Sequence, residues 1–96
     1  MNTFSNGTKV KVARRTVDTH TRVPAYIQGK IGIIERLCGS FRNPENLAYG
    51  RDGFPKQLLY RVRFLQTDVW EGYAGPLGDT IDVEIYAHWL SMEDRY

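Results

Sequence analysis

Three short segments of this 96-residue chain alternate apolar and charged residues with a period of two. They are residues 9–12, 60–64 and 81–85. Such alternation is typical of a strand with one buried face and one solvated face. A fourth run, 31–37, is rich in β-branched residues and is expected to form a strand with a bend or bulge at Gly32. No segment has the apolar spacing of a long helix, so the sequence predicts an all-β domain.

The length permits one domain, and residues 1–96 are expected to form a single small antiparallel barrel of the SH3-like kind. The apolar residues of 86–90 suit one short helical turn near the C-terminus, which in SH3-like barrels often precedes the last strand. An OB-like barrel is the alternative, but it typically carries a longer helix that this sequence does not show. Two connections, about 40–56 and 72–79, hold glycines and prolines and are expected to be loops.

Composition and charge narrow the classes of function. The 13 basic and 11 acidic residues give a net charge of +2. The sequence has no stripe of basic residues of the kind that indicates nucleic-acid binding. No apolar run approaches the ~18 residues of a membrane span, and the N-terminus lacks a signal-peptide pattern. The single cysteine, Cys38, cannot form an internal disulfide, and no cluster has metal-ligand spacing. We therefore expect a cytoplasmic protein that binds no metal and contacts neither membrane nor nucleic acid.

The sequence offers few candidates for catalysis. No serine, histidine and acid have the spacing of a nucleophilic set, and His88 lies among apolar residues where a packed side chain is expected. Asp82 and Glu84 share one face of a predicted strand. A cation could bind there, but pairing with the arginines of 61–63 on a neighbouring strand is the simpler interpretation.

The segment 19–32 is the strongest candidate for a binding surface. A plain connecting loop would more often consist of Gly, Asn, Asp and Ser, whereas this one carries histidine, arginine and tyrosine. Pro24 restricts Val23 to extended backbone, so the loop can hold the Arg22 guanidinium ready for two hydrogen bonds to an oxyanion. Aromatic residues in loops mark interfaces or close the ends of a barrel. The residues expected at an interface are His20, Thr21, Val23, Pro24, Tyr26, Phe41 and Trp70.

Five motifs follow one another along the chain: H-T-R within 20–32, G-I-I-E-R within 32–45, L-Y-R-V-R-F at 59–64, D-V-W-E at 68–71 and D-V-E-I-Y-A-H-W-L at 82–90. In kind and order they resemble motifs in the C-terminal barrel of the nitrile hydratase β-subunit, over nearly the whole chain. Nitrile hydratases convert a nitrile to an amide at cobalt or non-haem iron.

The resemblance implies a division of labour between chains. The metal of these enzymes lies in the α-subunit, on cysteines oxidised to sulfenic and sulfinic acids, while the β-subunit covers the site and supplies arginines to the cysteine oxygens. The arginine of H-T-R has that role, which carries over to Arg22. This chain would then be an inactive small subunit when isolated. The family's helical N-terminal half has no counterpart here, so a helical chain is implied as a second partner, as in the related three-subunit thiocyanate hydrolase.

Two other functions remain open at this stage. The chain could be a maturation or metal-loading accessory protein that leaves the α-subunit after its work. It could also be a generic SH3-like module that binds a peptide or a nucleic acid. The ligands that select cobalt or iron, and most of the pocket that selects nitrile or thiocyanate, would lie on other chains.

Overall fold

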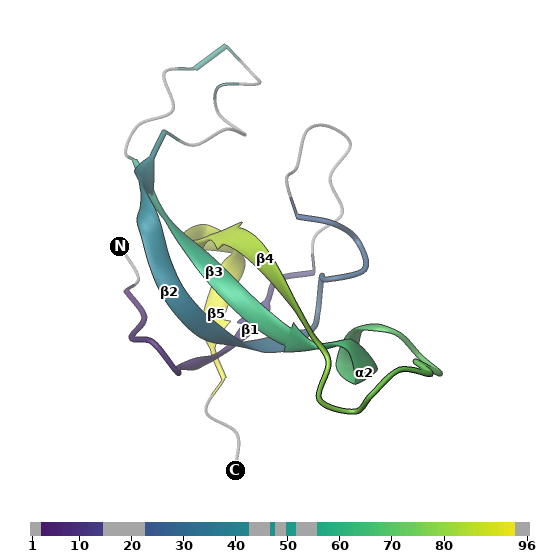
Figure 1. Ribbon diagram of the computed structural model, residues 1–96. Helices are drawn as coiled ribbons and strands as arrows, with labels where there is room; N and C mark the ends of the chain where they lie inside the picture. The colour runs from purple at the N-terminus through teal and green to yellow at the C-terminus, as the bar shows by residue number, and fades with distance from the viewer. Residues whose placement is uncertain (1–2, 15–22, 43–46, 48–49, 52–55, 94–96) are drawn as a thin grey trace.

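The computed structural model describes residues 3–14, 23–42, 47, 50–51 and 56–93. Five antiparallel strands form one sheet in the order β4–β3–β2–β1–β5 (Figure 1). A four-residue helix, α2, follows β3, and a 3₁₀ turn, η1, separates the last two strands. The mostly β fold and the helical turn before the final strand confirm the prediction from the sequence. The elements are β1 Lys9–Val12, β2 Ile31–Phe41, β3 Gln57–Leu65, α2 Gln66–Val69, β4 Thr80–Tyr86, η1 Ala87–Trp89 and β5 Leu90–Met92.

The sheet is curved and twisted, and β4 and β5 form its two edges (Figure 1). Within the described residues no ladder joins β4 to β5, so the closed barrel expected from the sequence is not seen. The three residues of η1 carry the chain directly from the β4 edge to β5, which pairs with β1. The two edges are therefore near each other at the η1 end, and the turn takes the place of a closing ladder there.

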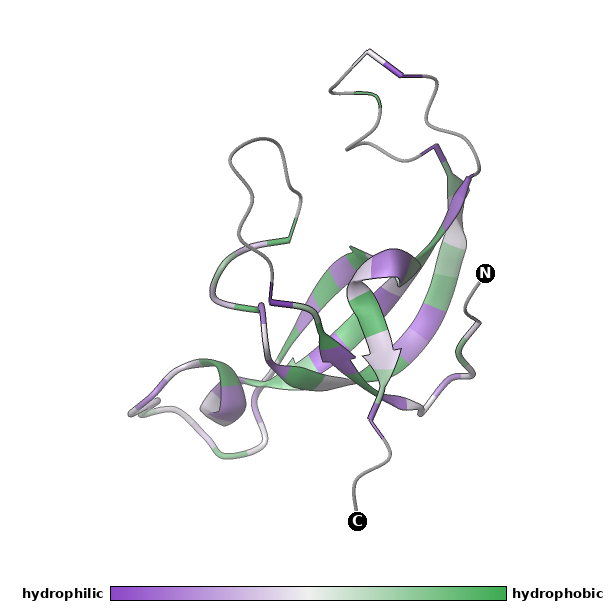
Figure 2. Cartoon of the chain, turned by 180° about the vertical axis from the view of Figure 1, so that it is seen from behind, coloured by the Kyte–Doolittle hydropathy of each residue, from purple (hydrophilic) through white to green (hydrophobic). Residues whose placement is uncertain are grey.

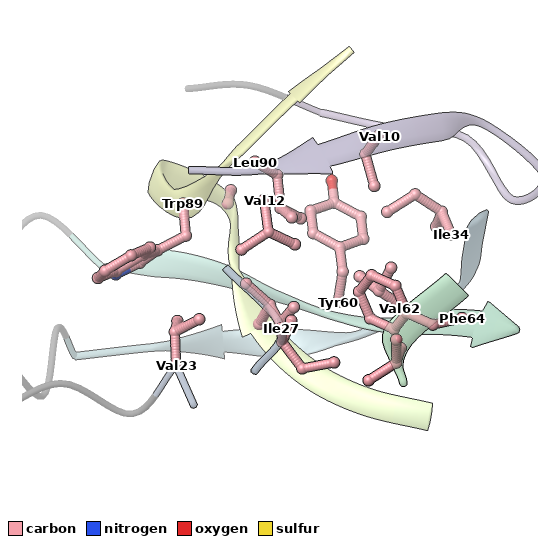
Figure 3. Packing of buried hydrophobic residues seen from close by; sticks show 13 residues of the cluster. Val10, Val12, Val23, Ile27, Ile34, Tyr60, Val62, Phe64, Trp89 and Leu90 are labelled. Carbon is pink, nitrogen blue, oxygen red and sulfur yellow. The ribbon is translucent and has the colours of Figure 1, made fainter. Parts of the chain in front are cut away.

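Alternation along the strands separates the core from the solvent, as Figure 2 shows by the change of hydropathy from residue to residue. In β1, Val10 and Val12 are fully buried while the intervening lysines are exposed. The aromatic rings of Tyr60, Phe64 and Trp89 fill the interior of the curved sheet (Figure 3). The Tyr60 hydroxyl accepts a hydrogen bond of 2.9 Å from the backbone N–H of Phe4, which ties the N-terminal segment to the core.

Strand β2 is longer than the 31–37 run predicted from the sequence, and its register shifts do not lie at Gly32. The register with β3 shifts between Ile34 and Arg36 and again between Leu37 and Gly39, whereas the pairing of β1 with β2 runs through Gly32 without a shift, so no bulge lies there. Gly32 is instead a site of close approach. A Cβ at this position would lie 2.8 Å from the Phe64 ring and 2.8 Å from Val62 Cγ1, so a glycine lets the core rings pack directly on the backbone.

Replacing Gly32 with alanine should therefore destabilise the fold. The added methyl group would force two buried side chains to move, and such overpacking costs about 1–3 kcal/mol of unfolding free energy. Urea denaturation of the isolated chain measures the change. Gly78→Ala is the matched control, because a Cβ at Gly78 meets no atom within 4 Å. Equal stability of the two variants would show that Gly32 is not required for packing.

Candidate functional site

Two aromatic residues from distant parts of the sequence stack against each other on the surface. The rings of Tyr26 and Trp70 have centroids 4.9 Å apart and an interplanar angle of 27°. Each residue is 41% exposed, so the pair is a surface feature rather than part of the core. Both had been predicted as interface residues, and the fold brings them together.

Trp70 is held in place by the helix that precedes it. Its indole Nε1 donates a hydrogen bond of 2.7 Å to Gln66 Oε1, and its backbone N–H donates to the carbonyl of Gln66 at 2.9 Å. Val69 is buried and anchors this helix on the core. The sequence analysis missed Gln66, although its position four residues before Trp70 is the spacing at which side chains on a helix meet.

Tyr26 lies in the second half of the candidate segment 19–32, in a tight turn just before β2. The backbone N–H of Ile27 donates to the Pro24 carbonyl at 3.0 Å, and the Ile27 side chain is fully buried. Gly29 has a φ of +80°, which glycine adopts without strain, and its N–H donates to the Val12 carbonyl at 2.9 Å. The turn is thus fixed both to the core and to β1, and Tyr26 projects from a rigid support.

On both sides of residues 15–22, the described chain is anchored near η1. The Ala13 N–H donates to the Trp89 carbonyl at 2.8 Å, and Val23 is 5% exposed in the same buried cluster as the Trp89 ring (Figure 3). Val23 had been predicted as an interface residue, but its side chain lies in the core of this domain. The burial of Val23 fixes the position of the chain just after residue 22, and Pro24 beside it is half-buried.

The remaining predicted site residues fall into two groups. His20, Thr21 and Arg22 lie outside the described residues. Phe41 is 45% exposed at the far end of β2, an eleven-residue strand that begins beside the turn carrying Tyr26. Phe41 and the turn that carries Tyr26 therefore lie at opposite ends of β2.

The charged face of β3 and β4 is organised by cross-strand ion pairs. Arg63 donates two hydrogen bonds to the Asp82 carboxylate, of 2.9 and 3.0 Å, and Arg61 lies 3.3 Å from Glu84. Both pairs join residues directly opposite each other, which confirms the prediction made for these four residues. Among the described residues, no three His, Cys, Asp or Glu side chains are grouped so that they could hold a metal ion.

The Arg63–Asp82 pair should make stability depend on pH. The two hydrogen bonds from Arg63 hold the pKa of Asp82 below its usual value. The pair therefore stabilises the fold above the ordinary carboxyl pKa of about 4, and this contribution is lost as the pH falls through the lower folded value. Asp82→Asn should lower Tm near neutral pH, and the difference from wild type should shrink on acidification. A difference in Tm that stays constant with pH would contradict this account.

Two further polar residues, Cys38 and Tyr73, each contact a carboxylate. Cys38 is half-buried, with its sulfur 4.0 Å from a carboxylate oxygen of Glu84. Tyr73 donates a short hydrogen bond of 2.6 Å to Asp79, which raises the pKa of the tyrosine and holds the 72–79 loop together.

No helix in the described part of the chain is long and apolar enough to span a membrane.

The sheet order, the 3₁₀ turn before β5 and the exposed, stacked aromatic pair define a small antiparallel β domain with a candidate binding surface. The sequence profile of the family described as "Nitrile hydratase beta subunit, C-terminal" matches residues 1–92. The chain belongs to this family.

Individual relatives agree with the family match. A nitrile hydratase subunit beta of Pseudomonas putida is 32% identical over 87 residues, which cover 91% of this chain and 40% of the relative. A low-molecular weight cobalt-containing nitrile hydratase subunit beta of Rhodococcus rhodochrous is 35% identical over 76% of this chain and 32% of its own length. The chain therefore spans less than half the length of these relatives.

A solved structure supports the fold. The recombinant apo-enzyme of thiocyanate hydrolase from Thiobacillus thioparus contains a chain that superposes with a TM-score of 0.89 at 26% sequence identity. The superposition covers 97% of this chain and 78% of that chain. The match thus extends over almost the whole domain.

Proposed function

We propose that this chain is a small β-type subunit of a nitrile hydratase-like enzyme that hydrates a nitrile or thiocyanate. The observation that carries the proposal is the family match over residues 1–92. The structural match to a chain of thiocyanate hydrolase supports it independently of the beta-subunit sequences. In this function the domain caps the metal site of an α-type partner and carries out no chemistry alone.

The proposed contact with the partner lies at the end of the domain that carries the stacked aromatics. Tyr26 and Trp70 are half-exposed and held rigidly, and both properties suit an interface because little side-chain freedom is lost on binding. The segment that carries His20, Thr21 and Arg22 precedes the Tyr26 turn in the sequence. Arg22 is proposed to donate two hydrogen bonds to the oxidised cysteines of the partner.

A metal in this enzyme would have to be held by the partner. Cobalt or iron in this family needs a cluster of cysteine ligands, and the only cysteine of this chain is Cys38. The described residues include no group of His, Cys, Asp or Glu that could hold a metal ion. The residues of this chain therefore do not fit the metal, and its own contribution is limited to covering the site and supplying a guanidinium.

Three further properties are proposed on the same basis. The domain is a barrel of the SH3-like type, in which η1 brings the β4 and β5 edges near each other. Residues 1–96 form one domain. The protein acts in the cytoplasm together with an α-type subunit and a chain that corresponds to the remainder of the relatives' beta subunits.

Co-expression tests the proposed function. The chain is produced together with an α-type nitrile hydratase subunit and passed over a size-exclusion column at micromolar concentration. A subunit should elute with the α-type chain in a constant ratio and remain with it after the metal is loaded. Separate elution contradicts the subunit function. Association that ends once the partner carries its metal indicates a maturation factor instead.

The isolated chain should retain no metal and hydrate no nitrile, because the cysteine cluster that the chemistry needs is absent from its sequence. Elemental analysis after dialysis, together with an amide-formation assay, measures both properties. Stoichiometric cobalt or iron in the dialysed chain would show that the metal belongs to this subunit and that the proposed division of labour is wrong.

A further inference from the structure

The two segments that carry the stacked aromatic pair differ in charge from the rest of the chain. Residues 66–79, which carry Trp70, contain three carboxylates and no lysine or arginine. The turn 23–29, which carries Tyr26, contains no charged residue. The chain as a whole has a net charge of +2, so its basic residues come from other segments.

The polar atom of the exposed indole already has a partner. Nε1 of Trp70 donates a hydrogen bond of 2.7 Å to Gln66 Oε1, and the side-chain nitrogen of Gln66 lies 3.5 Å from the Thr80 carbonyl oxygen. A molecule that binds at this surface therefore meets the ring of Trp70 rather than a vacant hydrogen-bond donor. The face of an aromatic ring is electron-rich and attracts cations, and tryptophan does so most strongly.

Two carboxylates lie close to this ring. Asp68 and Glu71 are both exposed, two positions before Trp70 and one position after it. Their Cα atoms are thus no more than about 8 Å from that of Trp70, which is within the range over which charges act at ordinary ionic strength. Lys30 lines the same groove as Asp68, but neither carboxylate forms an ion pair with a cation of the described residues. We call these two carboxylates and the stacked Tyr26–Trp70 pair the aromatic platform.

The charge of the aromatic platform selects between the two kinds of group that stack on exposed rings. A nucleic acid would bring phosphates close to Asp68 and Glu71, whereas proteins that stack bases place the aromatic residues in a basic groove. A cationic side chain gains from the ring and from the carboxylates together. Arginine suits the platform better than lysine, because its planar and weakly hydrated guanidinium stacks on aromatic faces. Within the described part of the chain, no lysine or arginine makes such a contact with either ring, so the cation comes from another chain.

We propose that the aromatic platform binds an arginine side chain of the α-type partner. The inference rests on the proposed function, which assigns the stacked aromatics to the contact, and adds the charge and the residue type that the partner presents there. Gln66 and the buried Val69 hold Trp70, and the buried Ile27 holds the turn of Tyr26, so the platform exists before the partner binds. Little side-chain freedom is then lost when the guanidinium stacks.

Neutral variants test the contribution of the carboxylates. The double variant Asp68→Asn with Glu71→Gln keeps the size of both side chains and removes both charges. Its affinity for an α-type nitrile hydratase subunit should fall about tenfold at low salt and by a smaller factor in about 1 M salt, where exposed charges are screened. Glu84→Gln with Glu93→Gln removes the same charge from β4 and from the residue after β5, and should bind within about twofold of wild type. Equal affinity of the two double variants at low salt overturns the proposal.

Chemical protection identifies the group that the platform binds. The complex is treated with phenylglyoxal, which modifies arginine, and the modified sites of the α-type subunit are located by mass spectrometry. The wild-type chain should protect an arginine of that subunit, and saturating Trp70→Leu, which lacks the aromatic face, should leave the same arginine reactive. If no arginine of the α-type subunit is protected, or if Trp70→Leu protects it equally, the inference is wrong while the proposed subunit function stands. If no complex forms with the α-type subunit, both fail.

Discussion

Arg22→Lys should lower turnover of the reconstituted enzyme by about tenfold to a hundredfold while the domain remains folded and the complex assembles. In the proposed role the Arg22 guanidinium donates two parallel hydrogen bonds to the oxygens of the partner's modified cysteines, whereas an ammonium is a point charge that cannot reproduce this fork. Loss of one charge-assisted hydrogen bond in a site that excludes water costs roughly 1.5–3 kcal/mol. The fall in rate follows if the transition state experiences the full loss.

The same variant separates a functional role of Arg22 from a structural one. Ala13 and Val23 lie on the two sides of the segment that carries Arg22. Trp89 anchors Ala13 and the core anchors Val23, so the fold does not depend on the arginine for those contacts. The Tm of the isolated chain should therefore stay within about a degree or two of wild type, as expected for a substitution away from the core. Arg42→Lys, at the end of β2, is the matched control. Wild-type turnover in Arg22→Lys would remove this residue from the site.

Trp89→Ala should have the largest effect on stability, lowering the unfolding free energy by about 3–5 kcal/mol. Trp89 is 2% exposed and is among the largest fully buried side chains. Its removal leaves a cavity where η1 packs against β3, in the buried cluster that also includes Val23 (Figure 3). For a domain of this size the loss is a large fraction of the total stability.

The chain contains one other tryptophan, and it provides the comparison. Trp70 is 41% exposed and stacks on Tyr26, so Trp70→Ala should cost only about 1 kcal/mol of unfolding free energy. Urea denaturation of the two variants measures both values. Similar losses would contradict the assignment of Trp89 to the core and Trp70 to the surface.

Local patterns in the sequence predicted the features that depend on neighbours along a strand. Alternation located β1, β3 and β4, and it correctly placed Arg61 and Arg63 opposite Glu84 and Asp82 because cross-strand pairs follow from which residues share a face. The sequence analysis missed two kinds of feature. Some elements are too short to show a periodic pattern, and the function of some residues depends on contacts with distant parts of the chain. Helix α2 has four residues, and the function of Gly32 depends on the Phe64 ring of another strand.

The candidate site could be predicted only in part. The residue types of the 19–32 segment and the exposed aromatics indicated an interface, but nothing in the sequence shows that Tyr26 and Trp70 stack, since the contact joins residues 44 positions apart in the chain. Val23 was assigned to the interface from its place in a polar loop, whereas tertiary packing buries it.

The central claim is that this chain is a lasting, non-metal part of a nitrile hydratase-like enzyme. Turnover of the metal-loaded α-type partner, supplied with the polypeptide that corresponds to the remainder of the relatives' beta subunits and measured with and without stoichiometric amounts of this chain, tests it most directly. The account predicts that amide formation, or hydrolysis of thiocyanate, requires this chain throughout the reaction and that the activity co-elutes with it. Full activity of the loaded partner after removal of this chain would contradict the claim.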